Sequence, residues 1–290
     1  MVKIQVPATT ANVGVGFDCL GIALNLYTYF TFEETDEFSI SGCEERFQNE
    51  DNLVYTSFLK ALAYLKKEVK GVSIIIDSNV PVSRGLGSSA TCVVGGVLGA
   101  YELTNTAIDK EAILNICTEI EGHPDNVAPA IYGGLMASYQ SEKSVISVPY
   151  LVDERFHFLA LIPDFETKTE EARKVLPKEL PFATAVRNSA KLSVVLKGFE
   201  MYESNILSEV MSDEVHEPYR KPLIHEYDEV RAICEEIESV CFYISGSGST
   251  LMNVMRDTEQ VEAIQKRLDK LEYGWKCVML DVDRAGASLC

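Results

Sequence analysis

The feature that most constrains this chain is a glycine- and serine-rich stretch, PVSRGLGSSAT, at residues 81–91. The β-branched run at 72–77 before it predicts a buried strand. The run at 90–100 after it is apolar or small on every side, which predicts a helix buried in a core. Ser88 and Ser89 occupy the expected N-cap of that helix. The free N–H groups of such a helix start suit a phosphate, so the stretch predicts an anion-binding loop.

Two common nucleotide-binding loops do not fit this stretch. A Walker A loop ends in Gly-Lys-Ser/Thr, and no lysine stands at that place. The spacing Gly85-x-Gly87-x-x-Ala90 fits a dinucleotide-binding turn, but the expected strand ends near Asp77, too early for such a turn. No second strand ending in an acid follows at the required distance either. A Gly/Ser turn that only caps a core helix is the alternative, so the rest of the chain must decide.

Composition limits the classes of protein to consider. A chain of 290 residues can hold two domains, and 47% apolar with 24% charged residues is typical of a soluble globular protein. The net charge of −18 argues against a nucleic-acid-binding face, which is basic. An anionic ligand must therefore be held locally, by amides, a metal ion or a few arginines.

The eight cysteines form no CxxC pair and no metal-ligand spacing, and several lie in apolar runs. We therefore expect buried free thiols in a reducing cytoplasm. The start of the chain does not resemble a signal peptide, and no apolar run is long enough to span a membrane.

The start of the chain predicts a strand at 2–6 and then a bent, glycine-containing loop, PATTANVGVGFD, at residues 7–18. Asp18 is a single acid between this loop and a long apolar run. It is either a turn or N-cap aspartate or part of a site, and this stretch alone does not separate the two.

Helical spacing of apolar residues predicts a helix after Asn52, which caps it, and another at 109–121. Glu121 falls on the apolar face of the second helix and needs a partner, either a metal ion or an arginine. A turn at HPDN opens a further short helix. Because Asp125 and Asn126 are neighbours there, we expect only one of the two to face a ligand.

The second half predicts the element order β-α-β-β-α-β of a ferredoxin-like unit, with extra helices in its first crossover. We place a domain boundary near residue 153. The expected segments are strand 156–162, helices 169–211, strands 240–244 and 251–255, helix 258–271 and strand 275–282.

Three polar features lie within this half. Thr169 and Arg173 stand one helical turn apart, and Arg220 lies in EPYRKPL, a proline-bounded loop that we expect not to be an ordinary helix. SGSGST at 245–250 joins two predicted strands. It is either a plain hairpin loop or a second backbone surface that faces the glycine-rich stretch.

PATTANVGVGFD, PVSRGLGSSA and SGSGST together resemble the three ordered motifs of the GHMP kinases, and the resemblance spans nearly the whole chain. It implies an α+β, two-domain fold. Residues 1–153 would form an ATP-binding domain like the second domain of ribosomal protein S5, and residues 154–290 a ferredoxin-like domain. Within the superfamily, the opening and the segment EGHPDNVAPAIYGG look most like the homoserine kinases.

The resemblance also implies a role for each matching residue. Those expected around ATP are Pro81, Val82, Ser83, Arg84, Gly85, Leu86, Gly87, Ser88, Ser89 and Ala90, with Asn52 near adenine. Ser89 and Glu121 would hold Mg²⁺. The amino-acid substrate would lie against Asn12, Asp18, His123, Arg173 and Arg220, with Thr169 at the reacting end and Asn126 where some relatives carry a basic carboxylate. Arginine forks suit the substrate carboxylate, and Asp18 suits its ammonium.

The function implied is the ATP-dependent phosphorylation of L-homoserine in threonine biosynthesis, by a cytoplasmic enzyme and possible homodimer with no nucleic-acid or membrane partner. We expect no dedicated base, because an amide such as that of Asn126 cannot take a proton near neutral pH. The alternatives are a mevalonate-type GHMP kinase or a catalytically inactive ligand-binding relative. An S5-like RNA-binding module is disfavoured by the acidic charge.

Overall fold

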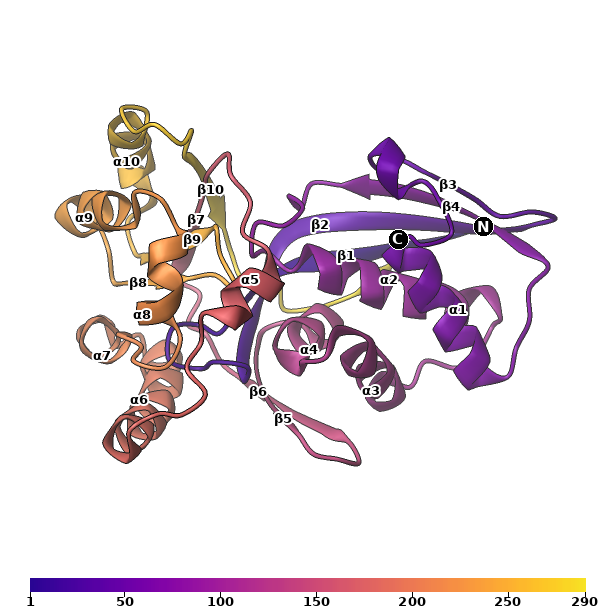
Figure 1. The fold of residues 1–290 in the computed structure, drawn as a ribbon, viewed down its shortest axis with the longest axis horizontal. Helices are drawn as coiled ribbons and strands as arrows, with labels where there is room; N and C mark the ends of the chain where they lie inside the picture. The colour runs from indigo at the N-terminus through magenta and orange to yellow at the C-terminus, as the bar shows by residue number, and fades with distance from the viewer.

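The structure is a computed structural model that describes residues 1–290, and it has the predicted α+β class. Two parts lie side by side along the long axis of the molecule (Figure 1). The first is built on a seven-stranded sheet of order β11-β1-β2-β4-β3. In addition, β5 pairs with β2, and β6 pairs with β5. Its strands are β1 (Val2–Ala11), β2 (Leu20–Thr35), β3 (Ser39–Ser41), β4 (Gly71–Ser78), β5 (Leu135–Gln140), β6 (Val145–Tyr150) and β11 (Ser288–Leu289).

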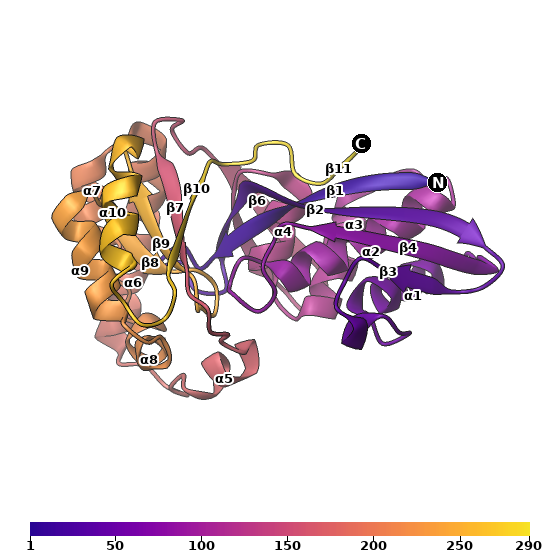
Figure 2. The same ribbon diagram turned by 90° about the horizontal axis from the view of Figure 1, so that it is seen from above.

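Four helices cover one face of this sheet (Figure 2). They are α1 (Leu53–Leu65), α2 (Ser88–Leu103), α3 (Lys110–Glu121) and α4 (Pro124–Tyr132). The predicted buried helix is α2, whose glycines admit aromatic side chains of β2. A Cβ on Gly95 would lie 2.5 Å from the Phe30 ring, and one on Gly99 would lie 2.5 Å from the Phe32 ring. The small residues of α2 therefore let the helix and the sheet approach closely.

The start of α2 differs from the prediction. Its N-cap is Gly87, which has φ of 70° and no side-chain capping bond, and Ser88 and Ser89 are the first two helical residues. The prediction that these serines cap the helix is wrong. The left-handed backbone of Gly87 turns the chain directly into the helix, and its Cβ position would lie 2.0 Å from Thr9 Oγ1. Only glycine fits there.

The first strand is longer than predicted. β1 continues through Pro7 to Ala11, and the pairing of β1 with β2 shifts register between Pro7 and Ala8. This irregularity accommodates a proline that has no N–H to donate. The bent loop is therefore confined to the residues between β1 and β2, where Asn12 (φ 69°), Val13 and Asp18 (φ 52°) have left-handed backbones.

The second part has a four-stranded antiparallel sheet of order β10-β7-β9-β8. The strands are β7 (His157–Ile162), β8 (Cys241–Ile244), β9 (Leu251–Met255) and β10 (Lys276–Leu280). The helices are α5 (Thr169–Lys174), α6 (Phe182–Met201), α7 (Ser204–Val210), α8 (Glu217–Arg220), α9 (Tyr227–Ile237) and α10 (Val261–Leu268). The predicted ferredoxin-like order is confirmed. The sequence reading missed α9 and placed α10 over too long a range.

EPYRKPL is not an ordinary helix, as predicted, but it is also not the expected loop. Glu217–Arg220 forms one helical turn, and a 3-10 turn, Lys221–Leu223, follows. Pro218 and Pro222 each stand in the first two positions of their turn, where the N–H group has no intrahelical partner in any residue. The two prolines are therefore compatible with two short helical turns in succession.

The predicted division into residues 1–153 and 154–290 stays a prediction. The chain passes from the seven-stranded sheet to the four-stranded sheet between β6 and β7. However, β11 pairs with β1, so the last residues of the chain belong to the first sheet. All eight cysteines are free; three are buried, whereas Cys290 is exposed. No helix has the length and apolar character needed to cross a membrane.

Candidate active site

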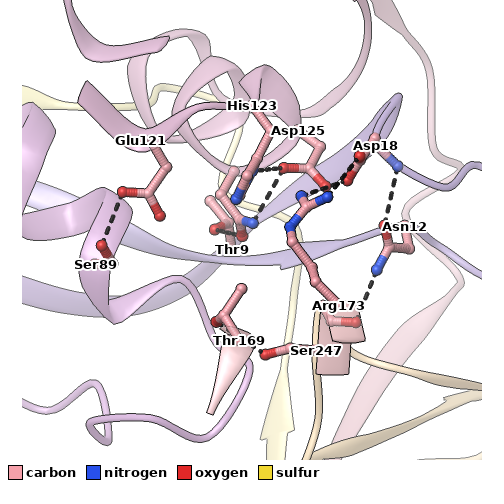
Figure 3. Close-up of polar contacts among 12 residues, drawn as sticks. Thr9, Asn12, Asp18, Ser89, Glu121, His123, Asp125, Thr169, Arg173 and Ser247 are labelled. Atoms are coloured by element: carbon pink, nitrogen blue, oxygen red, sulfur yellow. Dashed lines mark hydrogen bonds and ion pairs between the residues drawn. The ribbon is translucent and has the colours of Figure 1, made fainter. Parts of the chain in front are cut away.

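A cavity of about 590 Å³ lies where the glycine-rich stretch meets the loop after β1 and helix α5. This volume is in the usual range for small-molecule sites. The three motifs all reach it: Asn12 and Asp18 from the first, Gly85 from the second and Gly246 from the third. The cavity has a backbone wall, made of the main chain from Gly85 to Ala90, and a side-chain wall, made of Asn12, Asp18, His123, Arg173 and Arg220. Figure 3 shows four residues of the side-chain wall, Asn12, Asp18, His123 and Arg173.

The backbone wall offers a row of free N–H groups. None of the six amides from Gly85 to Ala90 donates a hydrogen bond to another group of the protein. They include the first three amides of α2, where the helix dipole also favours negative charge. An unpaired row of this kind at a helix start is suited to an anion. Of the ten residues predicted around ATP, only Leu86 and Ala90 do not line the cavity, because their side chains lie in the core.

SGSGST packs against this wall. This confirms the prediction that it is a second backbone surface facing the glycine-rich stretch, rather than a plain hairpin loop. Ser245 Oγ donates to Gly85 O (2.6 Å), and Thr250 N donates to Arg84 O (3.0 Å). A Cβ on Gly85 would lie 2.3 Å from Ser245 O. The backbones of the two glycine-containing loops are thus in direct contact, which requires glycine at position 85.

Glu121 ends α3 beside the start of α2. Ser89 Oγ donates to Glu121 Oε2 (2.8 Å), and no basic side chain forms an ion pair with this acid. Burial raises the pKa of Glu121, although the bond from Ser89 opposes the shift. Carboxylate and hydroxyl oxygens are ligands that Mg²⁺ accepts, and Mg²⁺ uses few protein ligands when substrate phosphates and water supply the others. This pair beside the free amides therefore fits a magnesium ion that accompanies a phosphate group.

A polar network crosses the start of α4. His123 Nδ1 and Asp125 Oδ1 lie 2.6 Å apart, Asn126 Nδ2 donates to the same oxygen (3.3 Å), and Thr9 Oγ1 donates to Asn126 Oδ1 (2.7 Å). Burial alone would lower the pKa of His123, but Asp125, and to a smaller degree Glu121, raise it above its usual value. Asp125 and Asn126 both line the cavity. The expectation that only one of the two faces a ligand stays a prediction.

Asp18 lies in a turn, but no backbone N–H group donates to its carboxylate, so it is not an N-cap. Arg173, on α5, donates two hydrogen bonds to the Asp18 carboxylate: Nη2 to Oδ1 (2.9 Å) and Nη1 to Oδ2 (3.1 Å). Asn12 fixes the loop, since Asn12 Oδ1 accepts from Asp18 N (3.1 Å) and Asn12 Nδ2 donates to Gly246 O (2.7 Å). The structure therefore brings together three predicted substrate residues, with the acid and one arginine already paired.

Arg220 is a buried cation without an acidic partner. Only 2% of it is exposed, and it donates to two carbonyl oxygens, Gly246 O (2.8 Å) and Ala172 O (3.2 Å), while forming no ion pair. Burial and the charge of Arg173 lower its pKa to about 10. A buried charge without an opposite charge is costly, so this position favours an anionic ligand.

Two acids beneath Arg220 hold α8 in place. Asp213 Oδ2 accepts three backbone N–H groups at the start of this turn, those of residues 215, 216 and 217. Glu217 Oε1 accepts from Ile244 N (2.7 Å), the last residue of β8. Burial raises the pKa of Glu217 to about 8. These bonds tie α8, and with it Arg220, to the strand that leads into SGSGST.

Other residues complete the cavity. Thr169 Oγ1 lies 3.3 Å from Ser247 Oγ. Asn52 caps α1 by accepting from Val54 N (2.9 Å), as predicted, and it lines the cavity together with Phe47, to whose O its Nδ2 donates (2.8 Å). The sequence reading missed Thr167, a buried cavity residue whose hydroxyl has no partner. It also missed Phe17, over which both arginines lie. In the sequence, only their positions next to Thr169 and Asp18 could have indicated that Thr167 and Phe17 belong to the site.

Comparison with known proteins agrees with this geometry. Residues 52–134, which contain the backbone wall, Glu121 and the start of α4, match the family described as GHMP kinases N terminal domain. The solved mevalonate kinase of Methanococcus jannaschii has the same fold, with a TM-score of 0.75 over 97% of this chain and 98% of that one, at 17% identity. The fold is that of the GHMP kinases.

More similar proteins define the family. A homoserine kinase of Clostridium botulinum is 39% identical over 289 residues, which is 99% of this chain and 97% of that protein. The crystal structure of homoserine kinase from Cytophaga hutchinsonii superposes with a TM-score of 0.89 at 28% identity, covering 100% of this chain and 97% of the other. The chain belongs to the homoserine kinase family.

Proposed function

We propose that this protein transfers the terminal phosphoryl group of ATP to the side-chain hydroxyl of L-homoserine, giving O-phospho-L-homoserine for threonine biosynthesis. One observation carries the proposal beyond family membership. A row of free amides that suits phosphates and a buried arginine without an acid share one cavity. The ligands that would satisfy both are a nucleotide polyphosphate and a small carboxylate.

The backbone wall would receive the phosphates of ATP, and Asn52, which also lines the cavity, would lie near the base. Ser89 and Glu121 would hold Mg²⁺. When bound, this ion neutralises charge on the phosphates as the phosphoryl group is transferred. Phosphoryl transfer asks the protein mainly for positioning and charge neutralisation, which these groups supply.

The side-chain wall would receive homoserine. Arg220 and Arg173 would hold its carboxylate, and Asp18 would hold its ammonium. Because Asp18 and Arg173 are paired with one another, the zwitterion would insert between opposite charges that are already aligned. Asn12 and His123 complete this wall, and Thr169 would lie at the reacting end.

We also propose that no residue acts as a dedicated base. Asn126 has no basic atom, and Asp125 is already bonded to His123 Nδ1, so His123 Nε2 is the alternative base that the proposal has to exclude by experiment. A loose transition state demands little of the attacking oxygen, so the hydroxyl proton leaves late, to a phosphate oxygen or water. The boundary near residue 153, a homodimer and a cytoplasmic location remain parts of the proposal; the free cysteines support the last.

A substrate panel tests the proposal. ADP release is measured with Mg·ATP and, in turn, L-homoserine, 4-hydroxybutyrate and mevalonate, and the product is identified by phosphorus NMR. We expect turnover with L-homoserine and at least a hundredfold lower kcat/KM for the two compounds without an amine. Preference for mevalonate would make the protein a mevalonate-type kinase. Ligand binding without ADP release would make it an inactive relative.

A further inference from the structure

Arg84 lies in the glycine-rich stretch, but its side chain bonds to the other part of the molecule. Nε donates to Pro163 O and Nη2 to Asp164 O, both at 3.1 Å. Nη1 lies 3.4 Å from Glu166 Oε1 and 3.4 Å from Val82 O. All three guanidinium nitrogens are therefore engaged by the protein. The guanidinium mainly holds residues 163–166, at the end of β7.

Residues 163–166 lead directly into the part of the cavity where the phosphoryl acceptor would bind, beside Thr167 and Thr169. Thr167 and Thr169 line the cavity immediately after them, and Arg173 follows one turn later on α5. Within the second part, Ser249 Oγ donates to Phe165 O (2.7 Å) and Asp164 N donates to Tyr273 O (2.9 Å). The bonds from Arg84 are the only hydrogen bonds or ion pairs between residues 1–153 and segment 163–169.

The main chain of Arg84 is also held in place. Arg84 O accepts from Thr250 N (3.0 Å), and the next amide, that of Gly85, begins the free row of the backbone wall. A ligand that orders this row therefore also orders the base of the Arg84 side chain. The side chain is only 16% exposed, and a planar fork on two carbonyl oxygens transmits position better than a flexible contact would.

We propose that Arg84 is a positioning residue that couples the two substrate sites. Through its bonds to residues 163 and 164, ATP on the backbone wall orders the segment that carries Thr167, Thr169 and Arg173, so that each substrate strengthens the binding of the other. The proposal rests on the proposed pair of substrates, ATP and homoserine. Such coupling is reciprocal and typically 5- to 150-fold in affinity.

Calorimetry tests the coupling directly. The Kd of L-homoserine is measured with and without a non-hydrolysable ATP analogue and Mg²⁺, for wild type, Arg84→Gln and Glu166→Gln. We expect the analogue to tighten homoserine binding about tenfold in wild type and less than twofold in Arg84→Gln, whose Kd for the analogue alone changes less than threefold. Glu166→Gln is the matched control: it loses an exposed ion pair but keeps both carbonyl bonds, so it should retain most of the coupling.

Two results would overturn the proposal. Retained coupling in Arg84→Gln is one, and a tenfold or larger loss of affinity for the analogue alone is the other, since it would make Arg84 a phosphate ligand. Arg84→Lys provides a second variant if the glutamine protein folds poorly. A single ammonium cannot reproduce the fork, so its coupling should be intermediate, and full coupling there would also contradict the proposal.

Hydrogen exchange gives a readout that needs no variant and no acceptor. The ATP analogue alone should slow exchange in wild-type peptides that cover residues 163–174, and unchanged exchange there would overturn the role of Arg84. Turnover of L-homoserine is measured separately. A wild type that protects 163–174 but does not phosphorylate homoserine would retain the connection and refute the proposed function.

Discussion

The two walls of the cavity are built in different ways. The backbone wall is six consecutive amides at one helix start, supported by a second glycine-containing loop. The side-chain wall takes its groups from the loop after β1, from α5, from α8 and from the start of α4. The backbone wall therefore depends on one short stretch of sequence and on the absence of side chains. The side-chain wall depends on charges that only the complete fold brings together.

This difference predicts how each wall fails. On the backbone wall, adding a Cβ should do more harm than changing most side chains. On the side-chain wall, the loss of one charge should leave its neighbours buried and unpaired, and should impair selection of the acceptor more than binding of the nucleotide. The five predictions below are ordered from the largest expected effect to the smallest.

Glu121 stands where the two walls meet, so its change should have the largest effect. Glu121→Gln keeps the shape and the bond to Ser89 but loses the charge, and we expect kcat to fall on the order of 10³-fold with the fold intact. Steady-state kinetics over a Mg²⁺ series measure this. Near-normal turnover with unchanged Mg²⁺ dependence would remove Glu121 from the metal site.

Arg220→Ala should cost about 2–5 kcal/mol, seen mainly in kcat/KM for homoserine. The affinity for an ATP analogue, measured alone by calorimetry, should barely change, because the amides of the backbone wall are untouched. Arg173→Ala should behave similarly, although its charge is shared with Asp18. Equal losses for ATP and homoserine would contradict this and indicate a phosphate role or a folding defect.

Glu217→Gln should change how stability depends on pH. The folded protein holds the Glu217 proton up to pH about 8, whereas the unfolded chain loses it near 4.5, so wild type loses this stability as the pH rises between those values. The amide can still accept from Ile244 N. Urea unfolding should show equal stability at pH 5 and a more stable variant at pH 9, on the order of 2–4 kcal/mol. Parallel pH curves would contradict this.

Gly87→Ala tests the backbone wall against a matched control. Gly87 and Gly134 have nearly the same φ, 70° and 69°, but a Cβ meets Thr9 Oγ1 at 2.0 Å in the first and nothing within 4 Å in the second. Both should lose about 1–2 kcal/mol of stability to backbone strain, and Gly87→Ala should lose more because of the contact with Thr9. Only Gly87→Ala should also weaken ATP-analogue binding, by about tenfold or more. Equal behaviour of the two variants would show that the close contact does not matter.

The smallest effect is expected at His123 and Asp125. If no base is needed, His123→Gln and Asp125→Asn should each lower kcat less than 10²-fold and leave the shape of the kcat–pH profile between about pH 5.5 and 9 unchanged. Saturating substrates are required, because both residues line the acceptor end. The loss of an acid limb together with a drop of 10²-fold or more would identify the base.

Features set by local sequence could be predicted. Glycine spacing predicted the anion loop, and helical periodicity placed Glu121 on an inner helix face. Its place beside Ser89 was implied by the family resemblance, and the structure shows that contact. Features set by the direction of side chains could not. The Asp18–Arg173 pair joins residues 155 positions apart, and the side chain of Arg84 leaves the loop in which its sequence motif places it. The cap of α2 was misplaced because Ser-Ser is a common capping signal, whereas the contact of Gly87 with Thr9 is tertiary.

The pairing of β11 with β1 has a consequence for synthesis of the chain. Residues 282–290 return to the first sheet: Val282 bridges Leu24, Ala287 N donates to Ala130 O (2.8 Å), and Cys290 N donates to Lys3 O (3.0 Å). The strand that leaves the ribosome first thus receives its outer neighbour last. At ordinary translation rates its free edge waits roughly 15–60 s, exposed to pairing with other chains. The edge of β1 at Ile4 and Gln5 is therefore open to pairing with other chains until β11 is made.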